Sequence, residues 1–260
     1  MNAPKPLLTA LREARHVVAF TGAGVSAESG LSTFRDAMTG LWSRFDPTRL
    51  ATAEAFAANP ELVWGWYEWR RMRVRHAEPN AAHRAIAALE AKVPATTLIT
   101  QNVDDLHERA GSRSPIRLHG SLFAPRCFDC GSAHGALADP PGDFEDGKPL
   151  APPRCAACGG FIRPGVVWFG EALPAEPMRC AFEAARACDV LLSIGTSGAV
   201  YPAADIPREA RRNGAVIVEV NPNATDLDDV ADFRLRGPAA ELLPALLAAA
   251  FQIGPRPSPG

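Results

Sequence analysis

The stretch HVVAFTGAGVSAESG (residues 16–30) carries a short apolar run directly into a glycine-rich loop. Three further apolar runs also end in small or polar residues, namely TTLIT (96–100), DVLLSIG (189–195) and AVIVEV (215–220). Helical patterns precede or separate these runs, at residues 4–15, 79–91, 176–188 and 203–213. Apolar strands that alternate with helices are typical of a parallel sheet covered on both faces. We therefore predict a Rossmann-like, doubly wound α/β domain whose ligand binds beyond the carboxyl ends of the strands.

Two segments interrupt this alternation. Residues 39–78 are rich in Trp and Arg and predict a helical insert, whereas residues 123–164 are rich in Pro and Gly and carry two CxxC pairs. We expect both segments to form a smaller, zinc-binding and helical lobe. Residues 253–260 are expected to be a disordered tail. The Rossmann-like domain is then discontinuous and consists of residues 1–38, 79–122 and 165–252.

The composition excludes several classes of protein. The chain has 260 residues and a formal net charge of −2, so it offers no general basic surface to nucleic acid or to an anionic membrane. No apolar run approaches the roughly 20 residues that a membrane span requires. Residues 1–15 also lack the apolar core of a secretory signal. We expect a monomeric, cytoplasmic protein without nucleic-acid or membrane partners.

The cysteine spacing predicts a metal site. Two CxxC pairs supply four thiolates, Cys127, Cys130, Cys155 and Cys158. Four protein ligands complete a tetrahedral zinc site and leave no open position, so we predict one structural Zn²⁺. Disulfides and redox-active dithiols are alternatives that a cytoplasmic location disfavours, and a nucleic-acid-binding zinc ribbon would lack a basic or aromatic stripe. The remaining cysteines, Cys180 and Cys188, lie in a helical pattern and are expected in the core.

The glycine-rich loop indicates a nucleotide site. Gly22 and Gly24 allow a tight turn and a close approach of the backbone to a pyrophosphate, and a helix that begins near Ser26 would direct its N–H groups at the phosphates. The spacing GxGx5G differs from the GxGxxG of hydride-transfer dehydrogenases. A simple strand-to-helix turn without a ligand stays an open alternative at this point.

Five motifs taken together are far more specific. They are GAGVSAESGLSTFR (22–35), TQNVDDLHERAG (100–111), LHGS (118–121), VVWFGE (166–171) and GTS (195–197). In sequence and order they resemble the signature motifs of the sirtuin family. The resemblance covers most of the chain and implies NAD as co-substrate and acylated lysine side chains of proteins or peptides as partners. It also implies the reaction, in which nicotinamide leaves and the acyl group moves from lysine to ADP-ribose.

The resemblance also assigns roles to individual residues. His119 is the expected catalytic base, because an imidazole titrates near neutral pH. Asn102 is the second expected catalytic residue and would hold the ribose hydroxyls or a water, whereas Asp104 would accept from the carboxamide of nicotinamide. The cofactor contacts that it implies are Gly22, Ala23, Gly24, Ser26, Phe34, Arg35, Gln101, Asn102, Asp104, Gly195, Thr196, Ser197, Asn221 and Ala239. Without the resemblance, His119 could be a core histidine and the QNVDD loop a helix cap, with Asp105 as the capping residue.

A second resemblance concerns the acyl group. Tyr67 and Arg70 are three residues apart and share a helix face, and they resemble the Tyr-x-x-Arg pair of the sirtuin subgroup that removes succinyl, malonyl and glutaryl groups. Ala51 stands where that subgroup has a small residue that widens the pocket. Val166 and Phe169 belong to the motif that lines the family's substrate tunnel. The alternative is an amphipathic helix that only packs its aromatic residues and solvates its charges.

Three other classes of protein are alternatives to a deacylase. An NAD hydrolase or ADP-ribosyltransferase on the same scaffold would begin with the same bond cleavage, and the tunnel motif and the Tyr67/Arg70 pair favour acyl-lysine instead. A module that binds without turnover would not need His119 and Asn102. A dehydrogenase would leave the four cysteines and the QNVDD loop without a role.

Overall fold

The computed structural model describes residues 3–31, 50–139 and 148–251. The predicted tail at 253–260 lies outside these ranges, as do residues 39–49 of the helical insert and 140–147 of the cysteine-bearing segment.

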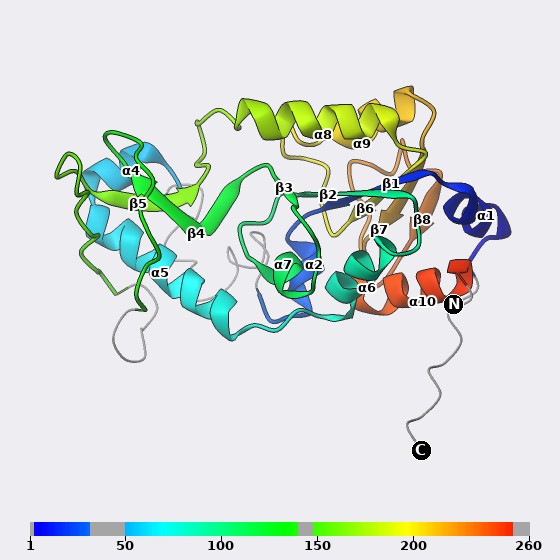
Figure 1. Ribbon diagram of the computed structural model, residues 1–260, viewed down its shortest axis with the longest axis horizontal. Helices are drawn as coiled ribbons and strands as arrows, with labels where there is room; N and C mark the ends of the chain where they lie inside the picture. The colour runs from blue at the N-terminus through cyan, green and yellow to red at the C-terminus, as the bar shows by residue number, and fades with distance from the viewer. Residues whose placement is uncertain (1–2, 32–49, 140–147, 252–260) are drawn as a thin grey trace, which may run out of the picture.

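Six parallel strands form the central sheet (Figure 1). In sheet order they are β3 (Ile116–Arg117), β2 (Ala95–Thr100), β1 (His16–Thr21), β6 (Val190–Ile194), β7 (Val216–Val220) and β8 (Phe233–Leu235). The register sets Thr21, at the carboxyl end of β1, beside Thr100 of β2 and Ile194 of β6. The chain adds strands on both sides of β1, so the topological switch point lies between β1 and β6, where doubly wound sheets bind ligands. The predicted fold class is confirmed.

Helices cover both faces of this sheet. One face of β1, with Val17 and Ala19, packs against α1 (Lys5–Glu13), α6 (Ala81–Leu89) and α10 (Ala239–Phe251). The other face, with Val18 and Phe20, packs against α8 (Ala175–Ala187) and α9 (Asp205–Arg212). Figure 1 shows α8 and α9 on the opposite side of the sheet from α6 and α10. Because both faces are buried, the strands are continuously apolar rather than alternating.

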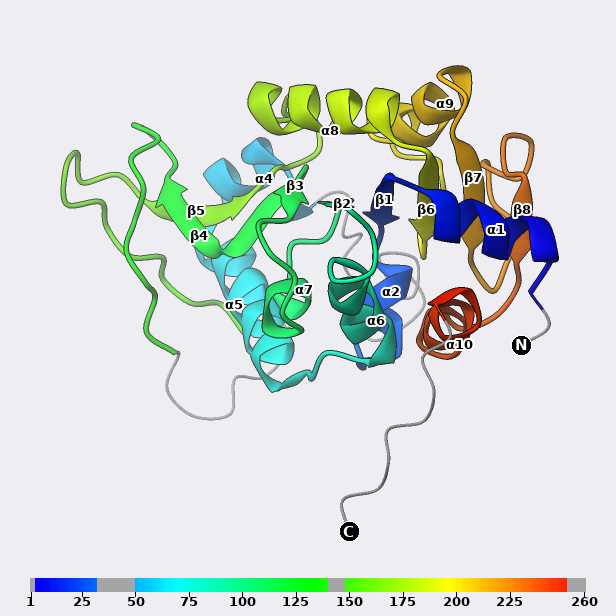
Figure 2. The ribbon, with the colours of Figure 1, turned by 45° about the vertical axis from the view of Figure 1, so that its right-hand side comes forward.

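A smaller lobe lies at one end of the molecule (Figure 2). It contains α4 (Ala53–Ala58), α5 (Pro60–His76) and an antiparallel pair, β4 (Gly120–Cys127) with β5 (Ile162–Val166). Thr52 and Asn59 accept from backbone N–H groups at the starts of α4 and α5, as helix-capping residues do. A separate aromatic core that includes Phe56, Trp64 and Trp168 holds these elements together. The cysteine-bearing segment was predicted to span residues 123–164. Its two predicted limits fall inside strands, the first within β4 and the second within β5.

Three local expectations need correction. The helix after the first strand, α2 (Gly24–Ala27), begins at Gly24 rather than near Ser26. At the start of α7 (Leu106–Arg109), Asp105 makes no capping bond, and Asp104 Oδ1 accepts from the backbone N–H of Leu106 instead. Cys188 is buried as expected, whereas Cys180 is only half-buried, because it lies on the outer side of α8 next to Glu176.

None of the helices in the described ranges combines the length and the hydrophobicity that a bilayer crossing demands.

Candidate active site

A cavity of about 1290 Å³ extends from the carboxyl ends of the parallel strands to the aromatic core of the small lobe. Most of the sequence-predicted site residues line it, although they come from segments far apart in the chain. Those on its wall are Gly22, Ala23, Gly24, Ser26, Ala51, Tyr67, Arg70, Gln101, Asn102, Asp104, His119, Val166, Phe169, Gly195, Thr196, Ser197 and Asn221.

The first two glycines are required by a contact between two loops. A Cβ atom on Gly22 or on Gly24 would lie 2.8 Å from the carbonyl oxygen of Gly195, closer than real side chains allow. The backbone N–H of Gly24 donates to the same oxygen at 2.8 Å. Gly195 itself has a φ of +60°, which favours glycine. These glycines therefore let the loops after β1 and β6 pack directly on each other at the switch point.

A hydrogen-bond network surrounds Ser26 at the centre of the cavity. Its hydroxyl donates to Asp104 Oδ2 at 3.0 Å and accepts from Asn102 Nδ2 at 3.2 Å. All three side chains are buried, and burial raises the pKa of Asp104 above its ordinary value, against the hydrogen bonds that favour its charged form. The loop after β2 thus presents an amide and a desolvated carboxyl group to the cavity.

His119 follows β3 and reaches the same region. Its Nδ1 lies 2.9 Å from the carbonyl oxygen of Gln101. Because a carbonyl can only accept, Nδ1 carries the hydrogen, and in the neutral ring Nε2 is left as an acceptor. Burial lowers the pKa of His119 below 6.5, although the bond to Gln101 acts in the opposite direction. The imidazole is therefore neutral at pH 7 and is able to take up a proton at Nε2.

The loops after β2, β6 and β7 are joined through Thr196. Gln101 Nε2 donates to Thr196 Oγ1 at 2.9 Å, and Asn221 Nδ2 donates to the carbonyl oxygen of Thr196, also at 2.9 Å. Ser197, the next residue, lines the cavity as well. These bonds fix the polar wall at the end of the cavity away from the small lobe.

At the small-lobe end, Tyr67 and Arg70 face the cavity from α5. Trp168 Nε1 donates to the hydroxyl of Tyr67 at 3.0 Å, and burial raises the pKa of that phenol to about 12. The guanidinium carbon of Arg70 lies 4.9 Å from the ring centre of Trp66 and 5.9 Å from that of Tyr67. Within the described ranges Arg70 has no hydrogen-bond or ion-pair partner. Among the described residues, this end therefore holds a cation without a hydrogen-bonded or paired carboxylate, and a phenol whose oxygen already accepts from Trp168 and whose O–H can donate.

Trp168 is held in turn by an ion pair. The guanidinium of Arg163 lies 3.4 Å from the centre of the Trp168 ring and is paired with Glu171, which also accepts from the backbone N–H of Trp168 at 2.8 Å.

Between the two ends of the cavity the wall is mostly apolar. Val166 and Ala51 are buried there, Phe169 is 48 % exposed, and the N–H of Phe169 donates to the carbonyl of Ala51 at 2.9 Å.

The four paired cysteines meet at the far end of β4. Their sulfur atoms all lie within 4.8 Å of one another, and the separations are 3.4 Å between Cys127 and Cys158 and 3.8 Å between Cys130 and Cys155. Zn–S bonds of about 2.3 Å in a tetrahedron separate the sulfurs by about 3.8 Å. The four thiols therefore fit a closed zinc site, as the spacing predicts.

Residues 22–202 match the family model described as the Sir2 family. The chain belongs to the Sir2 family. An NAD-dependent protein deacylase of Methylococcus capsulatus is 58 % identical over 243 residues, which cover 94 % of this chain and 95 % of that protein.

Two solved Sir2 structures are also similar to this chain. A mutant Sir2 homologue in complex with 2'-O-acetyl ADP ribose has a TM-score of 0.87 and 45 % identity, covering 96 % of this chain and 97 % of that one. A Sir2–p53 peptide–NAD⁺ structure has a TM-score of 0.81 and 31 % identity, covering 96 % and 99 %.

Three of the predicted cofactor residues of this Sir2 chain are not among the described residues that line the cavity. Phe34 and Arg35 lie outside the described residues. Ala239 is buried at the start of α10 and does not line the cavity wall in the described structure, so its contact with adenine stays a prediction.

A buried histidine beside Ser26, and the histidine that it packs against, could not be predicted from the sequence. His83 Nε2 lies 3.4 Å from the Ser26 hydroxyl, and the His83 ring packs edge-on against that of His107 at 4.8 Å. Burial lowers the pKa to about 4 for His83 and about 3 for His107. His83 sits at position N3 of α6, where its side chain also accepts from the N–H of Asn80. A polar residue in the apolar run AAHRAIAAL was the available signal. Trp168 lies in the motif VVWFGE (166–171), but its hydrogen bond to Tyr67 could not be predicted, because the two residues are 101 positions apart.

Proposed function

We propose that this Sir2 chain is an NAD-dependent deacylase of protein lysine side chains, and that it removes acidic acyl groups such as succinyl, malonyl and glutaryl as well as acetyl. One observation carries the proposal. A neutral imidazole whose Nε2 can accept a proton, a buried carboxyl–hydroxyl–amide network and a guanidinium with no hydrogen-bond or ion-pair partner among the described residues line a single cavity.

The residues at the strand ends fit NAD. The loops that contain Gly22–Gly24 and Gly195–Ser197, together with Gln101 and Asn221, would hold its phosphates and its adenosine half. When bound, NAD supplies a ribose that loses nicotinamide and accepts the acyl group. The 2'-O-acetyl ADP ribose bound by the homologue of known structure supports this assignment.

His119 is assigned as the general base. Its hydrogen bond to the Gln101 carbonyl fixes the tautomer in which Nε2 accepts, so the ring can take a proton from a ribose hydroxyl. The lowered pKa keeps the imidazole unprotonated at neutral pH. Below that pKa the ring is charged and cannot act as a base, so we expect turnover to fall at acidic pH.

Asn102 and Asp104 are assigned to the nicotinamide ribose and the carboxamide. An amide can hold ribose hydroxyls or a water without placing a full charge beside the breaking bond. A carboxyl group whose pKa is raised by burial can accept from, or donate to, a carboxamide. Ser26 orients both groups, because its hydroxyl bonds each of them.

Tyr67 and Arg70 are assigned to the distal carboxylate of an acidic acyl group. Arg70 would provide a charge-assisted, fork-shaped contact, and Tyr67 would donate its O–H, since Trp168 already donates to the phenolic oxygen. Ala51 would leave room for the longer acyl chain, and Val166 and Phe169 would contact its apolar part. Acylated lysine in a protein or peptide is the proposed partner, and the p53 peptide in a related structure supports it.

The zinc site is assigned a structural role, since all four ligand positions are filled by cysteine. The cytoplasmic location and the monomeric state stay predictions from the sequence.

Peptide-dependent release of nicotinamide tests the proposed function. Purified, zinc-loaded protein is incubated with NAD and with acetylated, succinylated or unmodified peptide, and nicotinamide and free lysine are quantified. We expect both to appear in equal amounts and only with acylated peptide. Nicotinamide release that is equal with and without acylated peptide would contradict the proposal and indicate an NAD hydrolase. Transfer of ADP-ribose to the peptide would indicate an ADP-ribosyltransferase.

A further inference from the structure

The loop after β7 forms the cavity wall farthest from the small lobe. All five of its residues from Asn221 to Thr225 line the cavity. The loop spans several exposed positions and includes neither a helix nor a strand. Its conformation therefore depends on contacts with residues that lie outside the cavity wall.

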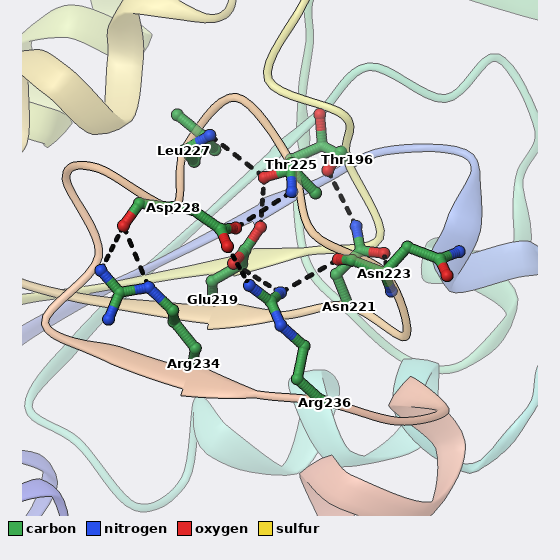
Figure 3. Close-up of polar contacts among 9 residues, drawn as sticks. All are labelled: Thr196, Glu219, Asn221, Asn223, Thr225, Leu227, Asp228, Arg234 and Arg236. Carbon is green, nitrogen blue, oxygen red and sulfur yellow. Dashed lines mark hydrogen bonds and ion pairs between the residues drawn. The ribbon is translucent and has the colours of Figure 1, made fainter.

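A buried carboxylate lies directly behind this loop (Figure 3). Glu219, two residues before Asn221, is 1 % exposed and does not line the cavity in the described structure. Its Oε1 accepts from the Thr225 hydroxyl, and its Oε2 accepts from Arg236 Nη1 at 2.7 Å. Both carboxylate oxygens are thus used within the protein.

Arg236 connects this carboxylate to two further points of the loop. Its Nη1 also donates to the carbonyl oxygen of Asn223 at 3.0 Å, and its Nη2 pairs with Asp228 at 2.6 Å. Asp228 in turn accepts from the backbone N–H of Thr225 at 3.0 Å. The loop is therefore held at Asn223 and at both the main chain and the side chain of Thr225, as Figure 3 shows.

The same loop contacts the neighbouring wall through Asn221. The Asn221 amide donates to the carbonyl of Thr196, and its side-chain oxygen accepts from the N–H of Asn223 at 3.3 Å. A shift of the loop would consequently move Asn221, the residue that we assign to the adenosine half of NAD.

In many dinucleotide-binding folds an acidic side chain near a strand end bonds the ribose hydroxyls directly. Glu219 is near such an end, but its oxygens are engaged by Thr225 and Arg236. We propose that Glu219 and Arg236 are positioning residues, which fix the Asn221–Thr225 loop so that the cavity accepts the adenosine half of the dinucleotide. This inference rests on the proposed function, since it assumes that NAD occupies the cavity.

A positioning role at this end predicts a selective kinetic effect. In the described structure, none of Glu219, Thr225 and Arg236 forms a hydrogen bond or an ion pair with His119 or Arg70. Loosening the loop should therefore weaken the binding of NAD and ADP-ribose, while kcat at saturating NAD and the KM for acylated peptide stay unchanged.

Three substitutions test the network, and one matched control accompanies them. Arg236→Met and Thr225→Val remove single partners at partly exposed positions, and Glu219→Gln removes the charge. Arg211→Met is the control, because Arg211 forms an ion pair of similar length, 2.8 Å, with Asp232, and neither residue lines the described cavity. Steady-state kinetics and calorimetric titration with ADP-ribose are measured for each protein, with melting temperatures as a check on folding.

For Arg236→Met and Glu219→Gln we expect the KM for NAD and the Kd for ADP-ribose to rise about tenfold, with kcat and peptide KM within about twofold of wild type. Thr225→Val should show a smaller rise, and Arg211→Met none. If Glu219→Gln does not fold, the other two variants decide the question. Variants with the ADP-ribose affinity of Arg211→Met would overturn the inference while leaving the proposed function intact. Wild-type protein that fails to bind ADP-ribose would overturn both.

Discussion

The two ends of the cavity are built in different ways. At the nucleotide end, the glycine loops after β1 and β6 pack main chain against main chain. Gly22 and Gly24 contact Gly195 without side chains between them. The adjoining Thr196 is held by the side-chain amides of Gln101 and Asn221. At the acyl end, the wall consists of side chains, with Tyr67 and Arg70 supported by aromatic rings.

The difference indicates where specificity can change. A side chain such as Arg70 can be replaced without altering the backbone that holds NAD, so the acyl preference should vary independently of the chemistry. The packed glycines of the nucleotide end offer no such freedom, because an added Cβ would overlap a neighbouring loop. His119 and the Ser26 network lie between the two ends and should serve both substrate types equally.

The largest effect is expected for the residue that both ends share. His119→Ala should lower kcat by at least about a hundredfold for acetylated and succinylated peptide alike, because the general base is lost. Melting temperature and binding of ADP-ribose should be preserved. The control His76→Ala changes an exposed histidine at the end of α5 and should leave kcat unchanged. Turnover by folded His119→Ala at the wild-type rate would remove this residue from the mechanism.

A nearly equal effect, confined to one substrate, is expected at the acyl end. Arg70→Met should reduce kcat/KM for succinylated peptide by about a hundredfold, since a charge-assisted contact to the carboxylate is lost, and should change acetylated peptide by less than about threefold. Arg75→Met, which removes an exposed arginine paired with Asp139, is the matched control. Equal losses on the two peptides would show that Arg70 acts on the fold rather than on the acyl group.

A smaller effect, common to all acyl groups, is expected at the nucleotide end. Gly24→Ala should raise the KM for NAD about tenfold and lower the melting temperature by several degrees, because the new methyl group would overlap the backbone of Gly195. The control is Gly135→Ala, where a Cβ meets no atom within 4 Å. A Gly24→Ala protein with wild-type stability and KM would mean that the two loops are not packed as described.

The smallest effect on turnover is expected at two buried histidines, His83 and His107. Replacing them should instead change how the stability depends on pH. His83 and His107 have folded-state pKa values of about 4 and about 3, below the 6.5 of an unfolded histidine. Between these values the unfolded state binds more protons. Each histidine therefore makes the free energy of unfolding fall by about 1.4 kcal/mol per pH unit as the pH drops below 6.5.

Replacing one of the pair isolates this contribution. Denaturant unfolding of wild type and His107→Gln between pH 7 and pH 4.5 should give a shallower pH dependence for the variant, by about 1.4 kcal/mol per unit. Identical slopes would show that His107 is not buried in its neutral form.

Much of the fold could be predicted because burial on both faces gives a strand a recognisable sequence. The run HVVAF (16–20) becomes β1 (His16–Thr21), and TTLIT (96–100) becomes β2 (Ala95–Thr100). Strand ends that share one edge then bring Ser26, Asn102 and His119 to one cavity, which is why motifs distant in the chain could be assigned to one site.

What could not be predicted depends on contacts between distant residues. The Trp168–Tyr67 bond joins residues 101 positions apart. The buried Glu219 network needed the positions of Thr225 and Arg236, since a glutamate within an apolar strand has no sequence pattern that reveals its partners. Between the adjacent acids Asp104 and Asp105, only the backbone geometry decides which one accepts from Leu106. The reason for Gly22 and Gly24 likewise became apparent only when the second loop was in place.

The mass of the nucleotide product bears most directly on the proposed chemistry. Short incubations of the protein with NAD and succinylated or acetylated peptide are analysed by mass spectrometry. We expect succinyl-ADP-ribose and acetyl-ADP-ribose, each formed together with one nicotinamide and one free lysine. Nicotinamide accompanied by unmodified ADP-ribose, with the peptide still acylated, would contradict the assignment of the cavity to acyl transfer.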